Sequence, residues 1–215
     1  MNDNEIKFKK MENIFEKVYE TKLWKTNNIK SYSGKGSERK NCIKFINFLN
    51  NFIEKNKIKT VYDFGCGDCE GVSDLNFDNI EYTGSDISIK ALDLAKNKLK
   101  EKNNIKLIKN NSLNIEGKYD LLIVKHVLGH WIDGKKNYNG LNKMNCDAED
   151  LITLFLQNNI TKFKYIIIND SIKDIISEKF PKEFKYDKLK FNSFDNRFHM
   201  IYIYPSNNYK IWKLF

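Results

Sequence analysis

The chain has 215 residues, a hydrophobic content of 41% and a formal net charge of +9. This length and apolar content predict one folded domain with a sizeable core. No apolar run reaches the ~20 residues that a membrane span needs, and the polar start at Met1 to Glu5 is unlike a signal peptide. We therefore expect a cytoplasmic protein without a membrane partner.

Charge is distributed unevenly along the chain. Residues 1–60 carry 14 Lys and Arg against 7 Asp and Glu, residues 61–150 carry 12 against 15, and residues 151–215 carry 11 against 6. A basic balance permits a nucleic acid or an anionic small molecule as partner. Arg occurs only at positions 39 and 197, so there is no Arg-rich tract, and this argues against nucleic acid.

Helices and strands are predicted to alternate, which favours a parallel sheet with right-handed crossovers. Ser37 and Ser88 are predicted to cap the helices that follow them. The expected elements, in chain order, are helices over 6–24 and 38–55, strands over 60–64 and 80–84, a helix over 89–101, strands over 105–108 and 119–124, a helix over 148–158, a strand over 165–168, and a closing β-hairpin with arms over 199–205 and 209–215.

The most informative stretch runs from Lys59 to Asp68, where an apolar, β-branched run ends in an acid and two glycines. Such a buried strand, followed by Gly65 and Gly67, is typical of a tight turn beneath a nucleotide. The dinucleotide fingerprint G-x-G-x-x-G would need a third glycine where this chain has Glu70.

The pattern Asp63-x-Gly65-x-Gly67 instead resembles motif I of the class I S-adenosylmethionine-dependent methyltransferases, although a third glycine is usual where this chain has Cys69. Two further stretches look like one subgroup of that family, which pairs an S-G-x-G-S loop with a K-x-V-L-x-H-W segment. Here they are Ser33–Ser37 and Lys125–Trp131, and Asp68 also matches the acid that this subgroup tends to have after motif I.

The resemblance implies a fold, a domain plan and a cofactor. The fold is α/β and Rossmann-like, with a mostly parallel seven-stranded sheet, one antiparallel strand from the closing hairpin, and helices on both faces. A single domain would cover residues 1–215, with an N-terminal helix and lid loop over 1–37 and a core over 38–215. The cofactor would be S-adenosylmethionine, with the S-G-x-G-S loop over its methionine carboxylate.

An acid at the end of the second strand supports the same cofactor. Asp86 lies 23 residues beyond Asp63, about the spacing at which a carboxylate accepts hydrogen bonds from ribose hydroxyls. The alternatives are a helix-leading acid for Asp86 and an ordinary interhelical turn for the S-G-x-G-S loop. The resemblance also implies that residues 111–113 lie along the edge of the adenine. The expected cofactor-binding residues are therefore Ser33, Gly34, Gly36, Ser37, Asp63, Gly65, Gly67, Asp86, Ile87, Asn111, Ser112 and Leu113.

The acceptor side is predicted after the fourth strand. Lys125, His126 and His130 are the candidate catalytic residues, because a base and a fixed cation suit methyl transfer to a proton-bearing oxygen. Lys125 and Trp131 are the candidate acceptor-binding residues, and Lys125 favours an anion because it has no acidic neighbour in the sequence. Either histidine could instead cap a helix or pack.

Missing motifs narrow the chemistry. Cys66-x-x-Cys69 could be half a zinc or redox site, but no second Cys or His pair accompanies it, so we expect it to pack under the loop and expect no metal. The Asp/Asn-Pro-Pro-Tyr motif of adenine-amine methylation and the Pro-Cys nucleophile of cytosine methylation are both absent. Metal-dependent relatives need a carboxylate where this chain has Lys125.

We therefore expect a methyltransferase that acts at oxygen on a small polar or anionic acceptor. A phosphorylated or sugar-like molecule, such as a capsule or surface-glycan precursor, fits this description. The alternatives are an RNA or protein methyltransferase, which the basic ends would favour, and a non-catalytic Rossmann-like nucleotide-binding module. The sequence does not indicate an oligomeric state.

Overall fold

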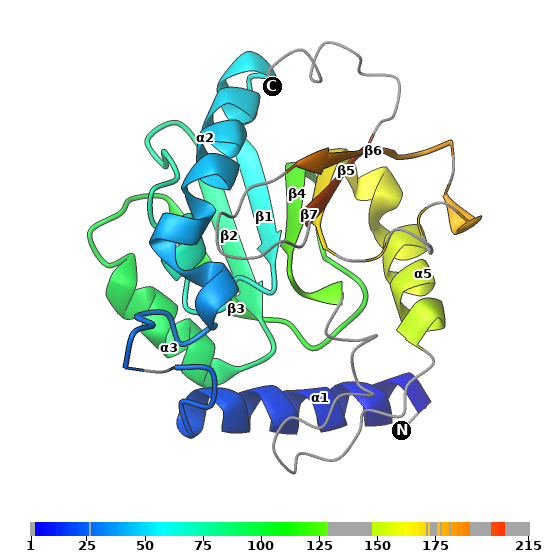
Figure 1. Ribbon diagram of the computed structural model, residues 1–215. Coiled ribbons are helices and arrows are strands. Elements are labelled where there is room, and N and C mark those ends of the chain that lie inside the picture. Colours follow the sequence, from blue (N-terminus) through cyan, green and yellow to red (C-terminus); the bar gives the residue numbers. More distant parts are fainter. Residues whose placement is uncertain are drawn as a thin grey trace.

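The computed structural model describes residues 3–25, 27–128, 148–170, 172, 176, 178–180, 182–189 and 199–204. Within this part the strands form a seven-stranded sheet in the order β3-β2-β1-β4-β5-β7-β6 (Figure 1). Strands β1 to β5 run parallel, and β7 is antiparallel to both of its neighbours. The strands are β1 (Thr60–Phe64), β2 (Glu81–Asp86), β3 (Ile105–Lys109), β4 (Tyr119–Lys125), β5 (Phe163–Asn169), β6 (Lys185–Leu189) and β7 (His199–Tyr204).

Helices cover both faces of the sheet (Figure 1). One apolar cluster joins α2 and α3 to one face, and a second cluster joins α1 and α5 to the other face. The helices are α1 (Asp3–Glu20), α2 (Arg39–Lys55), α3 (Ile89–Lys98) and α5 (Ala148–Asn159), with short 3-10 turns η1 (Lys35–Ser37), η2 (Glu70–Val72) and η4 (Ile160–Lys162). The predicted fold class is thus confirmed.

The closing hairpin is the element that the sequence placed wrongly. Strand β7 forms where its first arm was expected, but it pairs with β6, which precedes it in a stretch that carried no strand prediction. The expected second arm, 209–215, lies outside the described residues. The alternation of polar and apolar residues in β6 is weak, because its sequence, KYDKL, holds only two apolar residues. Its pairing within the sheet therefore decides that it is a strand.

The first helix ends earlier than predicted, at Glu20 rather than Trp24. Lys22 adopts the left-handed conformation with φ 56°, and the Leu23 N–H donates to the Val18 carbonyl at 3.0 Å. This is the six-to-one bond of a Schellman motif, which usually carries glycine at the left-handed position. Without that glycine the sequence offers no stop signal here. The motif fixes the last turn of α1, and with it Tyr19.

The two predicted caps have different outcomes. Ser88 is the N-cap of α3, and its hydroxyl accepts from the Ala91 N–H at 3.1 Å. Ser37 does not cap α2, because Glu38 occupies the N-cap position and makes no side-chain cap there. Ser37 instead closes the 3-10 turn η1, where its N–H donates to the Gly34 carbonyl at 3.0 Å.

Helix α1 lies across the edge of the sheet at which the parallel strands end (Figure 1). Glu16 accepts a hydrogen bond of 2.6 Å from the Ser88 hydroxyl after β2, and Glu12 pairs with Lys109 at the end of β3, at 2.7 Å. This edge is where open α/β sheets bind their ligands. Among the described residues, no helix has the length and apolar content that crossing a membrane requires.

Candidate functional site

The glycine turn after β1 has the backbone that its sequence predicts. Gly65 and Gly67 have φ of 73° and 59°, and Cys69, at the position of the usual third glycine, is also left-handed with φ 55°. A side chain on Gly65 would collide with Val127, and one on Gly67 would collide with the Ser33 hydroxyl. Glycine is therefore needed both for the turn and for close approach.

Asp86 ends β2 and braces this turn. Its two carboxylate oxygens accept the Gly67 N–H and the Ser88 N–H, each at 2.9 Å. Burial raises the pKa of Asp86 to about 6, although these backbone hydrogen bonds act in the opposite direction. Each oxygen has accepted one hydrogen bond and can accept another.

Asp63 lies beneath the turn, where it is 3% exposed. The Tyr82 hydroxyl donates to it at 2.6 Å. Burial raises the pKa of Asp63 to about 6, against the Tyr82 hydrogen bond and the charge of Lys125. Lys125 has no acidic neighbour in the sequence, but the pairing of β1 with β4 brings its charge close enough to act on Asp63.

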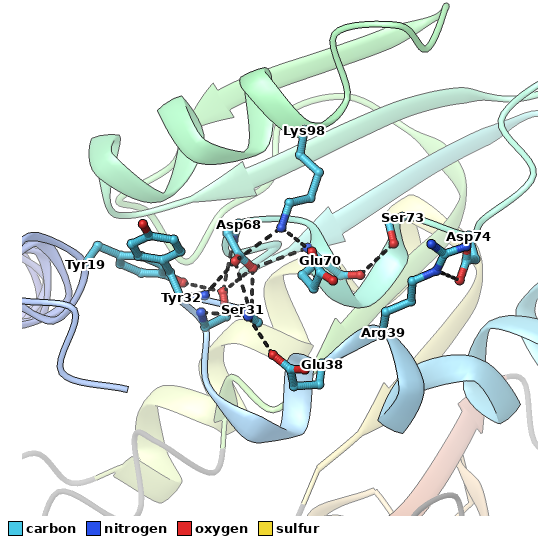
Figure 2. Close-up of polar contacts among 11 residues, drawn as sticks. Tyr19, Ser31, Tyr32, Glu38, Arg39, Asp68, Glu70, Ser73, Asp74 and Lys98 are labelled. Carbon is cyan, nitrogen blue, oxygen red and sulfur yellow. Dashed lines mark hydrogen bonds and ion pairs between the residues drawn. The ribbon is translucent and has the colours of Figure 1, made fainter. Parts of the chain in front are cut away.

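Residues 31–38, which we call the strap, are fastened to the turn by Asp68 (Figure 2). Asp68 is 1% exposed, and its carboxylate accepts the Tyr32 N–H at 2.7 Å and the Ser33 hydroxyl at 2.8 Å. It also accepts the Ser31 hydroxyl at 3.1 Å and lies 3.6 Å from the Lys98 ammonium of α3. The S-G-x-G-S loop is thus bound to the glycine turn and is more than a connector.

The strap has two further anchors. The Glu38 carboxylate accepts the Ser31 N–H at 2.7 Å, which ties the ends of the strap together. The Lys125 ammonium donates to the Gly36 carbonyl at 2.9 Å. The His126 ring also lies against Gly36, since a Cβ there would be 2.9 Å from Nδ1. Lys125 and His126 thus meet the strap at the end of β4.

The remaining predicted residues are placed as follows. Gly34 has φ of 88° and faces Trp24, whereas Ser37 lies against Gly71. Ile87 and the buried Leu113 belong to one apolar cluster. The side chains of Asn111 and Ser112 are exposed. His130 and Trp131 lie outside the described residues.

Sequence reasoning did not place three residues of this site among the binding residues. For Asp68 the sequence held an indication, because this acid follows motif I as it tends to do in the subgroup that the chain resembles. Ser31 had none, since it precedes the recognisable loop. Tyr19 sits among the apolar residues of an amphipathic helix, and that pattern predicts a core position.

Cys66 and Cys69 pack under the turn. Their mutual contact and burial raise the pKa of the Cys66 thiol well above its usual value, so it stays protonated. A protonated, buried thiol is a poor nucleophile and a poor metal ligand. Among the described residues, no three His, Cys, Asp or Glu side chains gather as metal ligands.

Comparison with known proteins gives one family match. Residues 62–147 match the family described as "Methyltransferase domain". These residues include the glycine turn, Asp86 and Lys125. No curated protein sequence matches the chain.

Solved structures resemble the chain in fold. Magnesium protoporphyrin IX methyltransferase from Synechocystis PCC 6803, solved with bound S-adenosylmethionine, is 15% identical with a TM-score of 0.63, and the match covers 96% of this chain and 99% of that one. The methyltransferase domain of bacterial CtHen1 is 18% identical with a TM-score of 0.54, covering 75% and 97%. The bifunctional kinase–methyltransferase WbdD is 12% identical with a TM-score of 0.56, covering 80% and 41%.

The family match and the fold agree with the geometry of the turn. The matched segment contains both glycines of left-handed φ and the acid at the end of β2. The rest of the sheet also has the expected form, since it is mostly parallel and β7 is its single antiparallel strand. The chain therefore carries a methyltransferase domain match over residues 62–147, within the fold that S-adenosylmethionine-dependent methyltransferases share.

Proposed function

We propose that this enzyme methylates an oxygen atom of a small, polar, anionic acceptor. A phosphorylated or sugar-like molecule, such as a precursor of a capsule or surface glycan, has this chemistry. The observation that carries the proposal is the contrast between an acidic interior and the excess of basic residues over 21–40, which is the strap with its flanks. The carboxylates favour the cationic cofactor, and the positively charged side chains favour an anionic acceptor.

The interior fits S-adenosylmethionine, which supplies an electrophilic methyl group on a sulfonium when bound. Asp63, Asp68 and Asp86 are all buried at the carboxyl ends of β1 and β2 or in the turn between them. Buried carboxylates favour a cationic ligand. Asp86 keeps acceptor capacity for ribose hydroxyls, and Ile87 and Leu113 offer apolar surface for a base.

The strap and its flanks have the opposite charge. Residues 21–40 contain six basic residues and one acid, Glu38, which is buried against the Ser31 N–H. The basic side chains at 22, 30, 35, 39 and 40 are exposed. These exposed basic side chains, which we call the basic rim, raise the local concentration of an anion near the strap.

The end of β4 offers groups that could hold the acceptor. Asn169 pairs in register with Lys125, is 2% exposed, and its side-chain oxygen has no hydrogen-bond partner among the described residues. A buried unpaired oxygen is costly unless a ligand donates to it. One hydroxyl of the acceptor would meet this need, and His126 or His130 would take the proton of a second hydroxyl, the one that attacks the methyl group in the in-line displacement.

The test is an acceptor screen that measures S-adenosylhomocysteine released from S-adenosylmethionine. Sugar phosphates and nucleotide-linked sugars are compared with short RNAs, and each active acceptor is then assayed with Lys125→Met. We expect this variant to lose acceptor-dependent turnover. Lys106→Met, which changes an exposed lysine on β3, is the matched control and should behave as the parent.

Two results would contradict the proposal. Turnover with RNA alone, falling steeply with added salt, would assign the basic rim to a phosphate backbone. Binding of S-adenosylhomocysteine without turnover of any acceptor class would favour a binding module.

A further inference from the structure

Tyr19 occupies the space directly above the glycine turn. It is 6% exposed, on the last turn of α1, and its ring meets Trp24 edge to face at 6.5 Å. Its hydroxyl lies 2.9 Å from the position that a Cβ on Gly67 would take and 2.8 Å from the Ser33 hydroxyl. Helix α1 thus places one polar group where a ligand must approach the backbone.

The direction of the hydrogen bonds around Tyr19 can be assigned by counting protons. Ser33 has one hydroxyl proton, which it donates to Asp68 at 2.8 Å, and it also accepts the Asp68 N–H at 3.0 Å. The Tyr19 hydroxyl must therefore donate to Ser33. The chain of donors runs from Tyr19 through Ser33 to the Asp68 carboxylate, and its free end is the phenol oxygen of Tyr19, which can still accept.

The surroundings of that oxygen decide which ligand group it suits. Burial and the nearby charge of Asp86 raise the pKa of Tyr19 well above its usual value, so the phenol stays neutral. Asp68 adds to the same negative field. A hydrogen-bond chain that ends on a carboxylate is polarised so that its head is a better acceptor, and a cationic donor fits it best. An anionic group would be repelled.

We propose that Tyr19 is a cofactor-binding residue whose phenol oxygen accepts a hydrogen bond from the α-ammonium group of S-adenosylmethionine. The inference rests on the cofactor identified above and adds a contact from α1 that the sequence did not indicate. It also sets the polarity of the site. Tyr19 of α1 is the acceptor end of a hydrogen-bond series that runs through Ser33 of the strap, so the ammonium rather than the carboxylate of the methionine part faces Tyr19.

The experiment is a calorimetric titration of the full chain and of Tyr19→Phe with three ligands. They are S-adenosylhomocysteine, its analogue without the amino group, and 5′-methylthioadenosine, which lacks the whole amino-acid part. We expect Tyr19→Phe to weaken S-adenosylhomocysteine about 10- to 100-fold, as for a lost hydrogen bond to a charged group, and to leave the other two affinities unchanged. Ser33→Ala removes the next hydroxyl in this series of hydrogen bonds, and it should also weaken the binding of S-adenosylhomocysteine.

Tyr32→Phe is the matched control, because Tyr32 is the neighbour of Ser33 but its ring lies under the Lys25 ammonium, 4.1 Å from the ring centroid. It should bind all three ligands as the parent does. Equal weakening of all three ligands by Tyr19→Phe would reduce Tyr19 to a support of the strap and overturn the inference. Unchanged binding of S-adenosylhomocysteine, or equal weakening of the analogue without the amino group, would also overturn it. Failure of the parent to bind any of the three would instead contradict the proposed function itself.

Discussion

Ser33 and Asp68 form a reciprocal pair between the strap and the glycine turn. The Ser33 hydroxyl donates to the Asp68 carboxylate at 2.8 Å, and the Asp68 N–H donates back to the same hydroxyl at 3.0 Å. Asp68 also accepts the Tyr32 N–H, so one buried carboxylate holds two consecutive residues of the strap.

Asp68→Asn should loosen the strap. An amide brings one acceptor and one donor where the carboxylate accepted several donors, so a buried donor of the strap loses its partner. We expect the free energy of unfolding to fall by about 1–3 kcal/mol and amide exchange at Tyr32 and Ser33 to accelerate. Asp74→Asn, which breaks the exposed ion pair with Arg39, should change stability much less. Parental exchange rates in the Asp68 variant would show that the strap is held elsewhere.

Gly67→Ala should abolish cofactor binding by crowding. Its φ is 59°, and the added Cβ would collide with Ser33. Gly117→Ala is a matched control. Its φ of 88° is also left-handed, but the added Cβ would lie 3.5 Å from its nearest neighbour atom, which is an ordinary contact. Both variants should lose about 1–2 kcal/mol of stability from the left-handed backbone. Only Gly67→Ala should fail to bind S-adenosylhomocysteine in calorimetry, and equal binding by the two variants would contradict the role of this turn.

Asp86 should bind the ribose, and the clean test changes the ligand. Replacing Asp86 would also remove its hydrogen bonds to the Gly67 and Ser88 N–H groups, so lost binding would be ambiguous. We expect the parent to bind adenosine about 10-fold or more tightly than 2′- or 3′-deoxyadenosine. The difference should shrink in Asp86→Asn. Equal affinities for the three nucleosides in the parent would remove the ribose assignment.

The buried carboxylate of Asp63 should make the protein less stable as the pH rises. Its pKa in the folded chain is about 6, above the ordinary value of 3.8, so its stabilising contribution is present below pH 4 and is lost as the pH rises through 6. Relative to the parent, Asp63→Asn should gain about 2 kcal/mol in free energy of unfolding between pH 4 and pH 7. Urea denaturation at both pH values measures the difference. A constant difference would mean that Asp63 titrates normally.

Local patterns predicted the parallel half of the sheet well. The apolar run before Gly65 reflects the burial of one strand, and the Ser88 cap reflects a hydrogen bond to one backbone N–H group. Each of these causes can be recognised from a few consecutive residues. Strand β6 was missed because its pairing with β7 depends on chain neighbours far from it in sequence. The end of α1 was missed because Lys22 takes a conformation that sequence rules reserve for glycine.

The candidate site was predictable where backbone demands choose the residue type. Gly65 and Gly67 could be placed because left-handed φ and close contact both require glycine. Tyr19 could not, because a tyrosine in an apolar stripe gives no sign of what its hydroxyl meets. The acid next to Lys125 was also missed, since Asp63 reaches it only through the pairing of β1 with β4.

The hydrogen bond from the Ser31 N–H to Glu38 joins two residues that are seven apart, both of them buried. It closes the strap into a ring of chain through a contact that does not involve Asp68. We therefore expect ligand entry to move this loop about its two ends without melting the segment. The entropy of ordering that loop is lost once, during folding, and is not lost again in each catalytic cycle.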